Sequence, residues 1–224
     1  HNSLEAPAIA SVRLEGVPHE YTAIDGIIED MTHIVLNFKA ALFRHFPSDE
    51  EMDSRKMQTV SKLLDITPDI LSENGGQYRV TLKDVVGPSV FDIVNPELHL
   101  FTVTKPLQKK IDLKIAMGRG YVPSERHTFE RVIDEIVIDS AFSPVRLVNY
   151  YVENTRVGQD TDFDRIIFEI TTDGRLSPEE ALSFAAQIGI HHFSVFDQIK
   201  PHSISFDQGE VELNKDREEI MAKL

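Results

Sequence analysis

Two groups of side chains in the sequence have the chemical types that bind metal ions. His191 and His192 are adjacent, so on a helix they point about 100° apart and cannot converge on one ion. The alternating acids of residues 160–164 are similar to the start of a calcium loop. However, Arg165 stands where that loop needs glycine, and Thr171 stands where it needs a bidentate glutamate. We therefore expect no metal site at either place.

The chain offers few groups for nucleophilic or phosphate chemistry. It has no cysteine, and Ser143 lacks the Gly-x-Ser-x-Gly surroundings of a nucleophilic serine. The segment Gly118-Arg119-Gly120 lacks the third glycine of a dinucleotide loop and the Gly-Lys-Ser/Thr end of a phosphate loop. Its glycines permit a tight turn that presents Arg119 and Tyr121 to a protein partner. The sequence thus predicts no catalytic residue and no cofactor, while its many carboxylates leave a hydrolase with paired acids open.

The composition narrows the class of protein. The 224 residues carry 23 Lys and Arg against 37 Asp and Glu, and the formal charge of −14 opposes binding to nucleic-acid phosphates. The absence of cysteine excludes disulfides and thiolate metal sites, and no apolar run approaches the roughly 18 to 20 residues of a membrane span. We expect a soluble, cytoplasmic protein with one large domain or two small ones.

The elements that position these residues follow from apolar periodicity. Alternation and β-type runs predict strands over residues 8–14, 41–45, 78–82, 90–93, 98–103, 110–117, 133–138, 145–157 and 163–172. Helical spacing predicts a helix over about 28–39, with Glu29 and Asp30 in its first turn, and residues 118–123 are expected to form a loop. The acidic stretch 47–76 has the character of an insertion, with a helix-like segment at 60–64.

The best-defined helix is predicted over 178–196. Ser177 and Glu180 form a capping box around Pro178, which suits the first helical position. The apolar surface is broader than one core-facing stripe needs, so we expect one flank to pack on its own sheet and the other on a second copy. The residues predicted at this dimer interface are Leu182, Ala185, Ile188, Gly189, Phe193 and Phe196.

Several stretches together resemble one family, the N-terminal assembly portion of the alpha subunit of bacterial-type RNA polymerase. They are LEGVPHEY at 14–21, IVLNFK at 34–39, GRGYVP at 118–123, IDS at 138–140, FSPV at 142–145, YVE at 151–153, TRVGQ at 155–159, TDFD at 161–164 and DGRLSPEEA at 173–181. Their order and spacing agree with the family over most of residues 2–199.

The resemblance implies an α+β fold with two domains and no catalytic residue. A β-rich insert domain is expected at 6–143, with the acidic insertion at 47–76, and a dimerisation domain of antiparallel sheet and helix at 144–199 with 1–5. Residues 200–224 are expected to be a linker or tail. The family's first strands and first helix would precede Asn2, and its DNA-binding C-terminal domain would follow Leu224.

The resemblance also implies the partners. Members of the family form homodimers and bind the large beta and beta-prime subunits of the polymerase. They contact DNA only through the C-terminal domain. The positions that match family contacts with the large subunits are Lys39, Gly118, Arg119, Gly120, Tyr121, Ile138 and Val145. A scaffold subunit of RNA polymerase, nucleoid-associated in the cytoplasm, is therefore the expected function. A stand-alone hydrolase using paired carboxylates and a β-rich small-molecule carrier are the alternatives.

Overall fold

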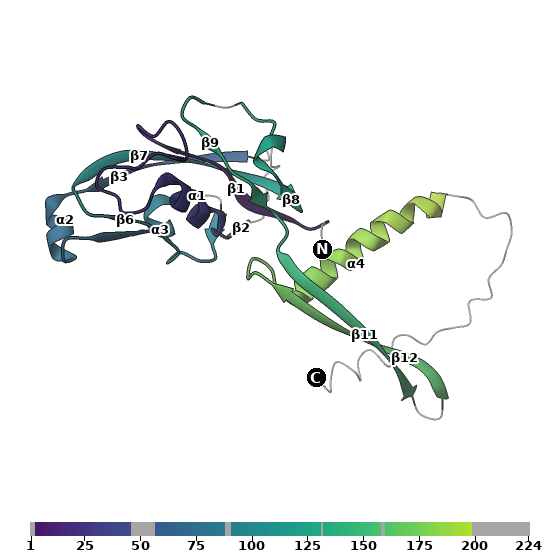
Figure 1. Ribbon diagram of the computed structural model, residues 1–224. Helices are drawn as coiled ribbons and strands as arrows, with labels where there is room; N and C mark the ends of the chain where they lie inside the picture. Colours follow the sequence, from purple (N-terminus) through teal and green to yellow (C-terminus); the bar gives the residue numbers. More distant parts are fainter. Residues whose placement is uncertain (1–2, 46–56, 88–90, 131, 158–159, 199–224) are drawn as a thin grey trace. The chain divides into compact units, whose positions relative to one another are not determined.

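The computed structural model describes residues 3–45, 57–87, 91–130, 132–157 and 160–198. The fold is mixed α+β, and its strand pairs are all antiparallel in the described part of the chain (Figure 1). The chain divides into two compact units, residues 1–186 and 187–224. In the second unit the structure describes only residues 187–198. The mixed α+β fold with antiparallel sheets confirms the fold class predicted from the sequence.

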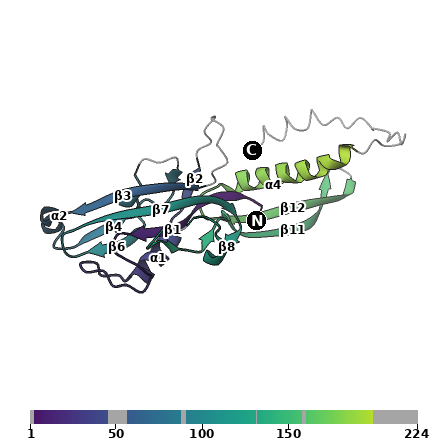
Figure 2. The same cartoon turned by 90° about the horizontal axis from the view of Figure 1, so that it is seen from above.

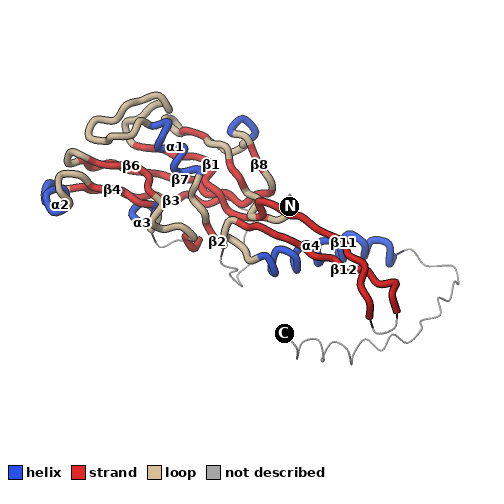
Figure 3. The backbone as a smooth tube through the Cα atoms, turned by 60° about the horizontal axis from the view of Figure 1, so that its bottom comes forward, coloured by secondary structure: helices blue, strands red, loops and turns tan. Residues whose placement is uncertain are grey.

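The strands account for most of the regular structure (Figure 3). They are β1 (Glu5–Leu14), β2 (Phe43–His45), β3 (Met57–Ile66), β4 (Tyr78–Thr81), β5 (Phe91–Ile93), β6 (His99–Val103), β7 (Leu107–Arg119), β8 (Tyr121–Val122), β9 (Ile136–Val137), β10 (Ser140–Ala141), β11 (Val145–Val157) and β12 (Asp160–Thr172). A four-stranded sheet has the order β3-β7-β1-β9, and the pairs β2-β5, β4-β6, β8-β10 and β11-β12 form two-stranded sheets.

Helices are short except for one near the end of the described chain. They are α1 (Met31–Lys39), α2 (Pro68–Glu73), α3 (Leu82–Val85) and α4 (Pro178–Phe193), with 3-10 turns η1 (Ser124–Arg126) and η2 (Ser194–Gln198). Helix α1 packs its apolar stripe into the core beneath the four-stranded sheet. The largest fully buried side chains of this core are Phe38, Phe43, Phe101, Met31, Ile34, Leu82, Leu100, Ile111, Leu113, Ile115, Ile138 and Val12.

Alternating polarity is typical of a strand with one buried face, but the structure buries nearly all of β1. It lies between β7 and β9 in the four-stranded sheet, and Figure 2 shows it beside β7. One face meets the apolar core, and the polar side chain of Ser11 on the other is covered because it donates a hydrogen bond to Glu135. Alternating polarity therefore marked a strand correctly but did not reveal that a later segment covers its second face.

Helix α1 begins three residues later than predicted. Asp30 is its N-cap, because the Asp30 carboxylate accepts a hydrogen bond of 2.8 Å from the backbone amide of His33. Glu29 is not part of the helix. Its carboxylate instead accepts from the Thr102 amide at 2.7 Å and contacts His99 Nε2 at 2.9 Å. The two acids that suggested a first turn thus have separate tasks, one as the cap and one as a link to β6.

The helix expected at residues 60–64 is wrong, because this segment lies in strand β3. The strand pairs antiparallel with β7 over its whole length, from Met57 opposite Ala116 to Ile66 opposite Leu107. Leu64 and Ile66 point into the core from alternating positions. Short apolar runs do not distinguish a helix from a strand, and here the hydrogen-bonded ladder with β7 decides. The acidic residues 47–56 of the predicted insertion lie outside the described residues.

The predicted loop at 118–123 and strand at 133–138 also need correction. Strand β7 continues through Arg119, and residues 121–122 form β8, so the turn between them is confined to Gly120. Strand β9 covers only residues 136–137. The residues before it form a turn in which Asp134 has a positive φ of 64°. The pairing of β7 and β9 with β1, and of β8 with β10, sets these boundaries, and these pairing partners are distant in the sequence.

The ion pair between Lys114 and Glu135 covers the outer face of the four-stranded sheet. The Lys114 Nζ lies 2.7 Å from Glu135 Oε1, and their side chains are 13% and 3% exposed. The Glu135 carboxylate also accepts from Ser11 and from the Val132 amide. Burial acts to raise the pKa of Glu135, but these hydrogen bonds outweigh it and hold the pKa below its usual value.

This pair makes the first testable prediction. Lys114→Met should lower the free energy of unfolding by about 3 kcal/mol, because it leaves the Glu135 carboxylate buried without its cation. Lys110→Met is the matched control, since Lys110 lies on the same strand with a half-exposed side chain and should change stability by less than about 0.5 kcal/mol. Urea unfolding followed by circular dichroism measures both, and equal effects of the two variants would contradict the assignment.

Candidate interface site

A cluster of polar residues at the end of α1 joins residues that the sequence analysis had singled out separately. Lys39 Nζ lies 2.9 Å from Asp139 Oδ2, and Asp139 Oδ1 accepts a hydrogen bond of 2.9 Å from the Ser124 amide. The Tyr121 hydroxyl hydrogen-bonds to the same carboxylate. We refer to Lys39, Tyr121, Ser124 and Asp139 as the Lys39 cluster. Asp139 is the residue that sequence reasoning missed as a site, although it lies in the quoted segment 138–140.

The electrostatics of the Lys39 cluster follow from these contacts. The hydrogen bond from Lys39, supported by the Ser124 amide, holds the pKa of Asp139 far below its usual range. Desolvation, followed by the hydrogen bond to the Asp139 carboxylate, raises the pKa of the Tyr121 hydroxyl above its usual value. Tyr121 is still 62% exposed, and Lys39 is exposed as well. The cluster therefore presents an aromatic ring and a fixed ion pair to the surface.

Gly118 and Gly120 are required for different physical reasons. A Cβ on Gly118 would lie 2.7 Å from the ring of Phe142, so this position needs glycine because another side chain packs against its backbone. Gly120 has a φ of +64°, and its carbonyl accepts from the amide of Phe142 at 2.7 Å. Gly118 thus leaves room for the Phe142 ring, and Gly120 binds the Phe142 amide and forms the turn that leads to Tyr121.

The other residues predicted at the large-subunit interface lie in different surroundings. Arg119 is exposed, and its Nε lies 2.9 Å from Glu5 Oε1 on the neighbouring strand β1. Ile138 and Val145 are only 2% and 3% exposed. Their side chains pack inside this chain, so they can shape a surface from beneath but do not present themselves to a partner. Packing against distant segments decides this burial: the Ile138 amide, for example, donates to the Ala10 carbonyl of β1 at 2.9 Å.

Strands β11 and β12 form a two-stranded sheet with an apolar patch on one face. The register places Val148 opposite Ile170, Tyr150 opposite Phe168 and Val152 opposite Ile166. We call these six residues the apolar hairpin face. The first five in chain order, from Val148 to Phe168, are between 42% and 67% exposed, and the rings of Tyr150 and Phe168 lie 6.5 Å apart. Contiguous exposed apolar area of this kind typically marks an interaction surface.

Helix α4 has the predicted start and a shorter end. The Ser177 amide donates to the Glu180 carboxylate at 2.9 Å and the Glu180 amide donates to Ser177 Oγ at 3.2 Å, which is the predicted capping box. The α-helix ends at Phe193, and residues 194–198 form a 3-10 turn. Ser194 Oγ donates to the His191 carbonyl there, a local hydrogen bond that competes with regular helical bonding.

The residues predicted at the dimer interface are accessible along this helix. The four exposed ones are Leu182, Ala185, Phe193 and Phe196, while Ile188 and Gly189 are of intermediate exposure. Phe193 and Phe196 have ring centroids 6.5 Å apart. Helix α4 and the 3-10 turn that follows it therefore carry exposed apolar side chains.

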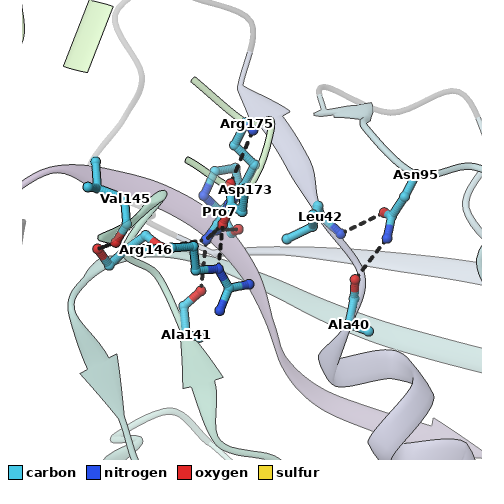
Figure 4. A network of polar contacts seen from close by, with 10 residues as sticks. Pro7, Ala40, Leu42, Asn95, Ala141, Val145, Arg146, Asp173 and Arg175 are labelled. Atoms are coloured by element: carbon cyan, nitrogen blue, oxygen red, sulfur yellow. Dashed lines mark hydrogen bonds and ion pairs between the residues drawn. The ribbon is translucent and has the colours of Figure 1, made fainter. Parts of the chain in front are cut away.

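A buried arginine joins distant segments and was not predicted as a site residue (Figure 4). The Arg175 side chain is 3% exposed, and its guanidinium pairs with Asp173, which is equally buried, at 2.7 Å. It also donates to the backbone carbonyls of Pro7, Ala141 and Ser143. The only signal in the sequence was the segment Asp173-Gly174-Arg175 itself, which contributed to the family resemblance.

Within the described ranges, no three His, Asp or Glu side chains lie together in an arrangement that could bind a metal ion. His191 and His192 are both exposed, with ring centroids 6.4 Å apart. A wide, open hollow of about 340 Å³ is lined in part by Glu20, Glu125 and Glu135. The Glu135 carboxylate is already occupied by Lys114 and Ser11.

No helix among the described residues is both long and apolar enough to cross a lipid bilayer.

The fold and these surfaces define a mixed α+β protein whose distinctive features are exposed faces. Residues 12–143 match the family model described as the RNA polymerase Rpb3/RpoA insert domain. Because this match covers more than half of the chain, the chain belongs to that family.

Three curated relatives are named DNA-directed RNA polymerase subunit alpha. The protein of Protochlamydia amoebophila (strain UWE25) is 60% identical over 224 residues, all of this chain and 60% of the relative. That of Carboxydothermus hydrogenoformans is 35% identical over 224 residues, all of this chain and 66% of the relative. That of Desulfovibrio desulfuricans is 38% identical over 209 residues, 92% of this chain and 53% of the relative. The chain thus spans between about half and two thirds of these relatives.

The Lys39 cluster makes a prediction about the ionisation of Tyr121. In Asp139→Asn the pKa of Tyr121 should fall toward its ordinary value of 10.0, because the neighbouring negative charge is removed. In Lys39→Ala it should rise instead, since Lys39 acts to lower it. The measurement is an ultraviolet titration from which the curve of Tyr121→Phe is subtracted. A Tyr121 pKa that is the same in all backgrounds would show that the cluster is not formed.

Proposed function

We propose that this chain is the assembly scaffold of a DNA-directed RNA polymerase: it dimerises and holds the large beta and beta-prime subunits. Family membership supports the proposal, as does the printed name of the three relatives. The structural observation that carries it is the exposure of the apolar hairpin face together with the apolar residues of α4. Such surfaces suit a protein whose work is binding other proteins.

We assign dimerisation to helix α4. Leu182 and Phe193 are 44% and 73% exposed, and apolar groups of this size gain free energy when a second copy covers them. Ala185 and Gly189 are small, which permits two helices to approach closely. The dimerisation domain of the proposal comprises residues 144–199 with 1–5, the insert domain comprises 6–143, and the tail 200–224 lies outside the described residues.

We assign contact with the large subunits to the Lys39 cluster and the adjoining turn at Gly120. Lys39, Arg119 and Tyr121 reach the surface, and the glycines shape the backbone between them. Ile138 and Val145 contribute by supporting this surface from inside the chain. A fixed ion pair beside an aromatic ring combines the polar specificity and buried area that protein interfaces use.

The other functions considered have less support. A hydrolase with paired carboxylates or a β-rich small-molecule carrier would need an enclosed pocket with converging polar groups. Glu135 is the least exposed of the three carboxylates that line the open hollow, and it is already paired with Lys114. Neither alternative is favoured by the family match. The charge of −14 also supports a role in which any contact with DNA belongs to another part of the polymerase.

The dimer assignment is tested by placing a charge on α4. Leu182→Asp and Phe193→Asp should each weaken self-association by more than about a hundredfold, because a carboxylate would be buried in the interface without a partner. Ser183→Asp is the control, since Ser183 lies between the two apolar residues in sequence but is polar and exposed. Sedimentation equilibrium of the subunit gives the association constant. A tight dimer with native circular dichroism in both Asp variants would refute the assignment.

The large-subunit assignment is tested by removing the surface cations. Lys39→Ala and Arg119→Ala should reduce co-purification of the beta and beta-prime subunits by about tenfold at raised salt, as expected for residues central to an interface. Thermal stability should change little, because exposed ion pairs contribute at most about 1 kcal/mol. Lys105→Ala is the control, an exposed lysine paired with Asp25 at 2.6 Å. Undiminished recovery for both test variants would argue against this surface.

A further inference from the structure

The Arg175 guanidinium uses all three of its nitrogens inside the protein. Nε lies 3.0 Å from Asp173 Oδ2, and Nη2 lies 2.7 Å from the same oxygen. Nη1 donates to the Pro7 carbonyl at 2.9 Å, and Nη2 donates to the carbonyls of Ala141 and Ser143 at 3.2 and 2.9 Å. Figure 4 shows these groups converging from separate parts of the ribbon. A planar fork of five N–H groups can satisfy such a set of acceptors, whereas a lysine ammonium cannot.

The groups that Arg175 contacts belong to segments with different tasks. Pro7 lies in β1, within the four-stranded sheet. Ala141 ends β10, and Ser143 lies in the link from β10 to β11. Arg175 itself follows β12 and comes two residues before Ser177, the residue that caps α4. One side chain thereby joins the insert sheet to both ends of the segment that carries the apolar hairpin face.

A second arginine also binds this turn. Arg44, in β2, donates from Nη2 to the Gly174 carbonyl at 3.0 Å and from Nε to the Arg175 carbonyl at 3.3 Å. Gly174 has a φ of +93°, and a Cβ there would meet Val94 at 3.4 Å. The Asp173 amide donates to the Pro144 carbonyl at 3.0 Å. The turn is therefore bound to the insert body on several sides, and Arg175 is its buried centre.

The segment from Asp139 to Ser143 lies between the two proposed binding surfaces. At one end Asp139 holds Lys39 and the Ser124 amide, and at the other end the carbonyls of Ala141 and Ser143 are held by Arg175. A change at Arg175 can thus reach the Lys39 cluster through only a few residues of backbone.

We infer that Arg175 is a positioning residue that couples the Lys39 cluster to the hairpin and to the start of α4. The coupling fixes the Lys39 cluster relative to the hairpin and to the first turn of α4, all of which lie in the unit of residues 1–186. This inference rests on the proposed function for its biological meaning, but the coupling itself is a property of the protein alone. Asp173 neutralises the charge of the guanidinium and accepts hydrogen bonds from Nε and Nη2. The guanidinium also donates to the three carbonyls.

The coupling is tested by measuring a distance across it. The sequence has no cysteine, so Leu36→Cys in α1 and Glu153→Cys in β11, both exposed, provide two sites for spin labels. Double electron–electron resonance between the two spin labels should give a narrow distance distribution with Arg175 present and a clearly broader one in Arg175→Met. The backbone amides of residues 140–143 should exchange hydrogen about tenfold faster in the same variant, because buried carbonyls lose their donors. Arg146→Met is the control, since Arg146 is mostly exposed and lies 3.9 Å from Asp173.

The outcomes separate this inference from the proposed function. If Arg175→Met keeps the native distribution and native exchange rates, the inference is overturned, whatever the large subunits do. If Arg175→Met does not fold, Arg175→Lys carries the test: it keeps the charge but loses the fork, and it should broaden the distribution. An unbroadened Arg175→Lys would equally overturn the inference. Failure of the unmutated protein to recover the large subunits would refute the proposed function and leave the distance result standing.

Discussion

The antiparallel ladder between β1 and β7 is the interaction on which most of the structure depends. It places Glu5 opposite Arg119 and Leu14 opposite Ile111, so β1 is bound to a strand about a hundred residues further along the chain. Three consequences follow from this pairing. The core beneath β7 is closed, the carbonyl of Pro7 is brought to Arg175, and the chain emerges from β7 at Gly120 beside β10. Both proposed binding surfaces are built on groups that this ladder positions.

Buried charge in this protein is used to hold backbone in place. Glu135 fixes a turn by accepting from the Val132 amide while it neutralises Lys114, and Arg175 binds carbonyls while Asp173 neutralises it. Taking ions out of water offsets most of what such pairs gain, so their net contribution to stability is small compared with apolar burial. Their effect is geometric, because an ion satisfied by several directed hydrogen bonds allows one arrangement of the segments that supply them.

The two proposed surfaces differ in physical character. The apolar hairpin face and α4 gain free energy from removal of apolar area from water, which is suited to a lasting contact between copies. The Lys39 cluster offers a fixed ion pair and one aromatic ring, which favour orientation and selectivity. The proposed function as a scaffold requires both kinds of surface. The family match covers residues 12–143, whereas the hairpin and α4 follow that range.

Local patterns in the sequence were sufficient for elements whose signals lie close together in the chain. The capping box at Ser177 and Glu180 and the alternation along 145–157 each involve only neighbouring residues, and the structure has both as predicted. The quoted motifs were sufficient for the family. Tertiary structure alone decided that residues 60–64 are a strand, that Glu29 bonds to β6, that Ile138 and Val145 are buried, and that Asp139 and Arg175 are centres of contacts. The physical reason is the same in each case: the deciding partner, whether a strand edge, a carbonyl or a lysine, lies about 30 to 170 residues away, and no local pattern specifies it.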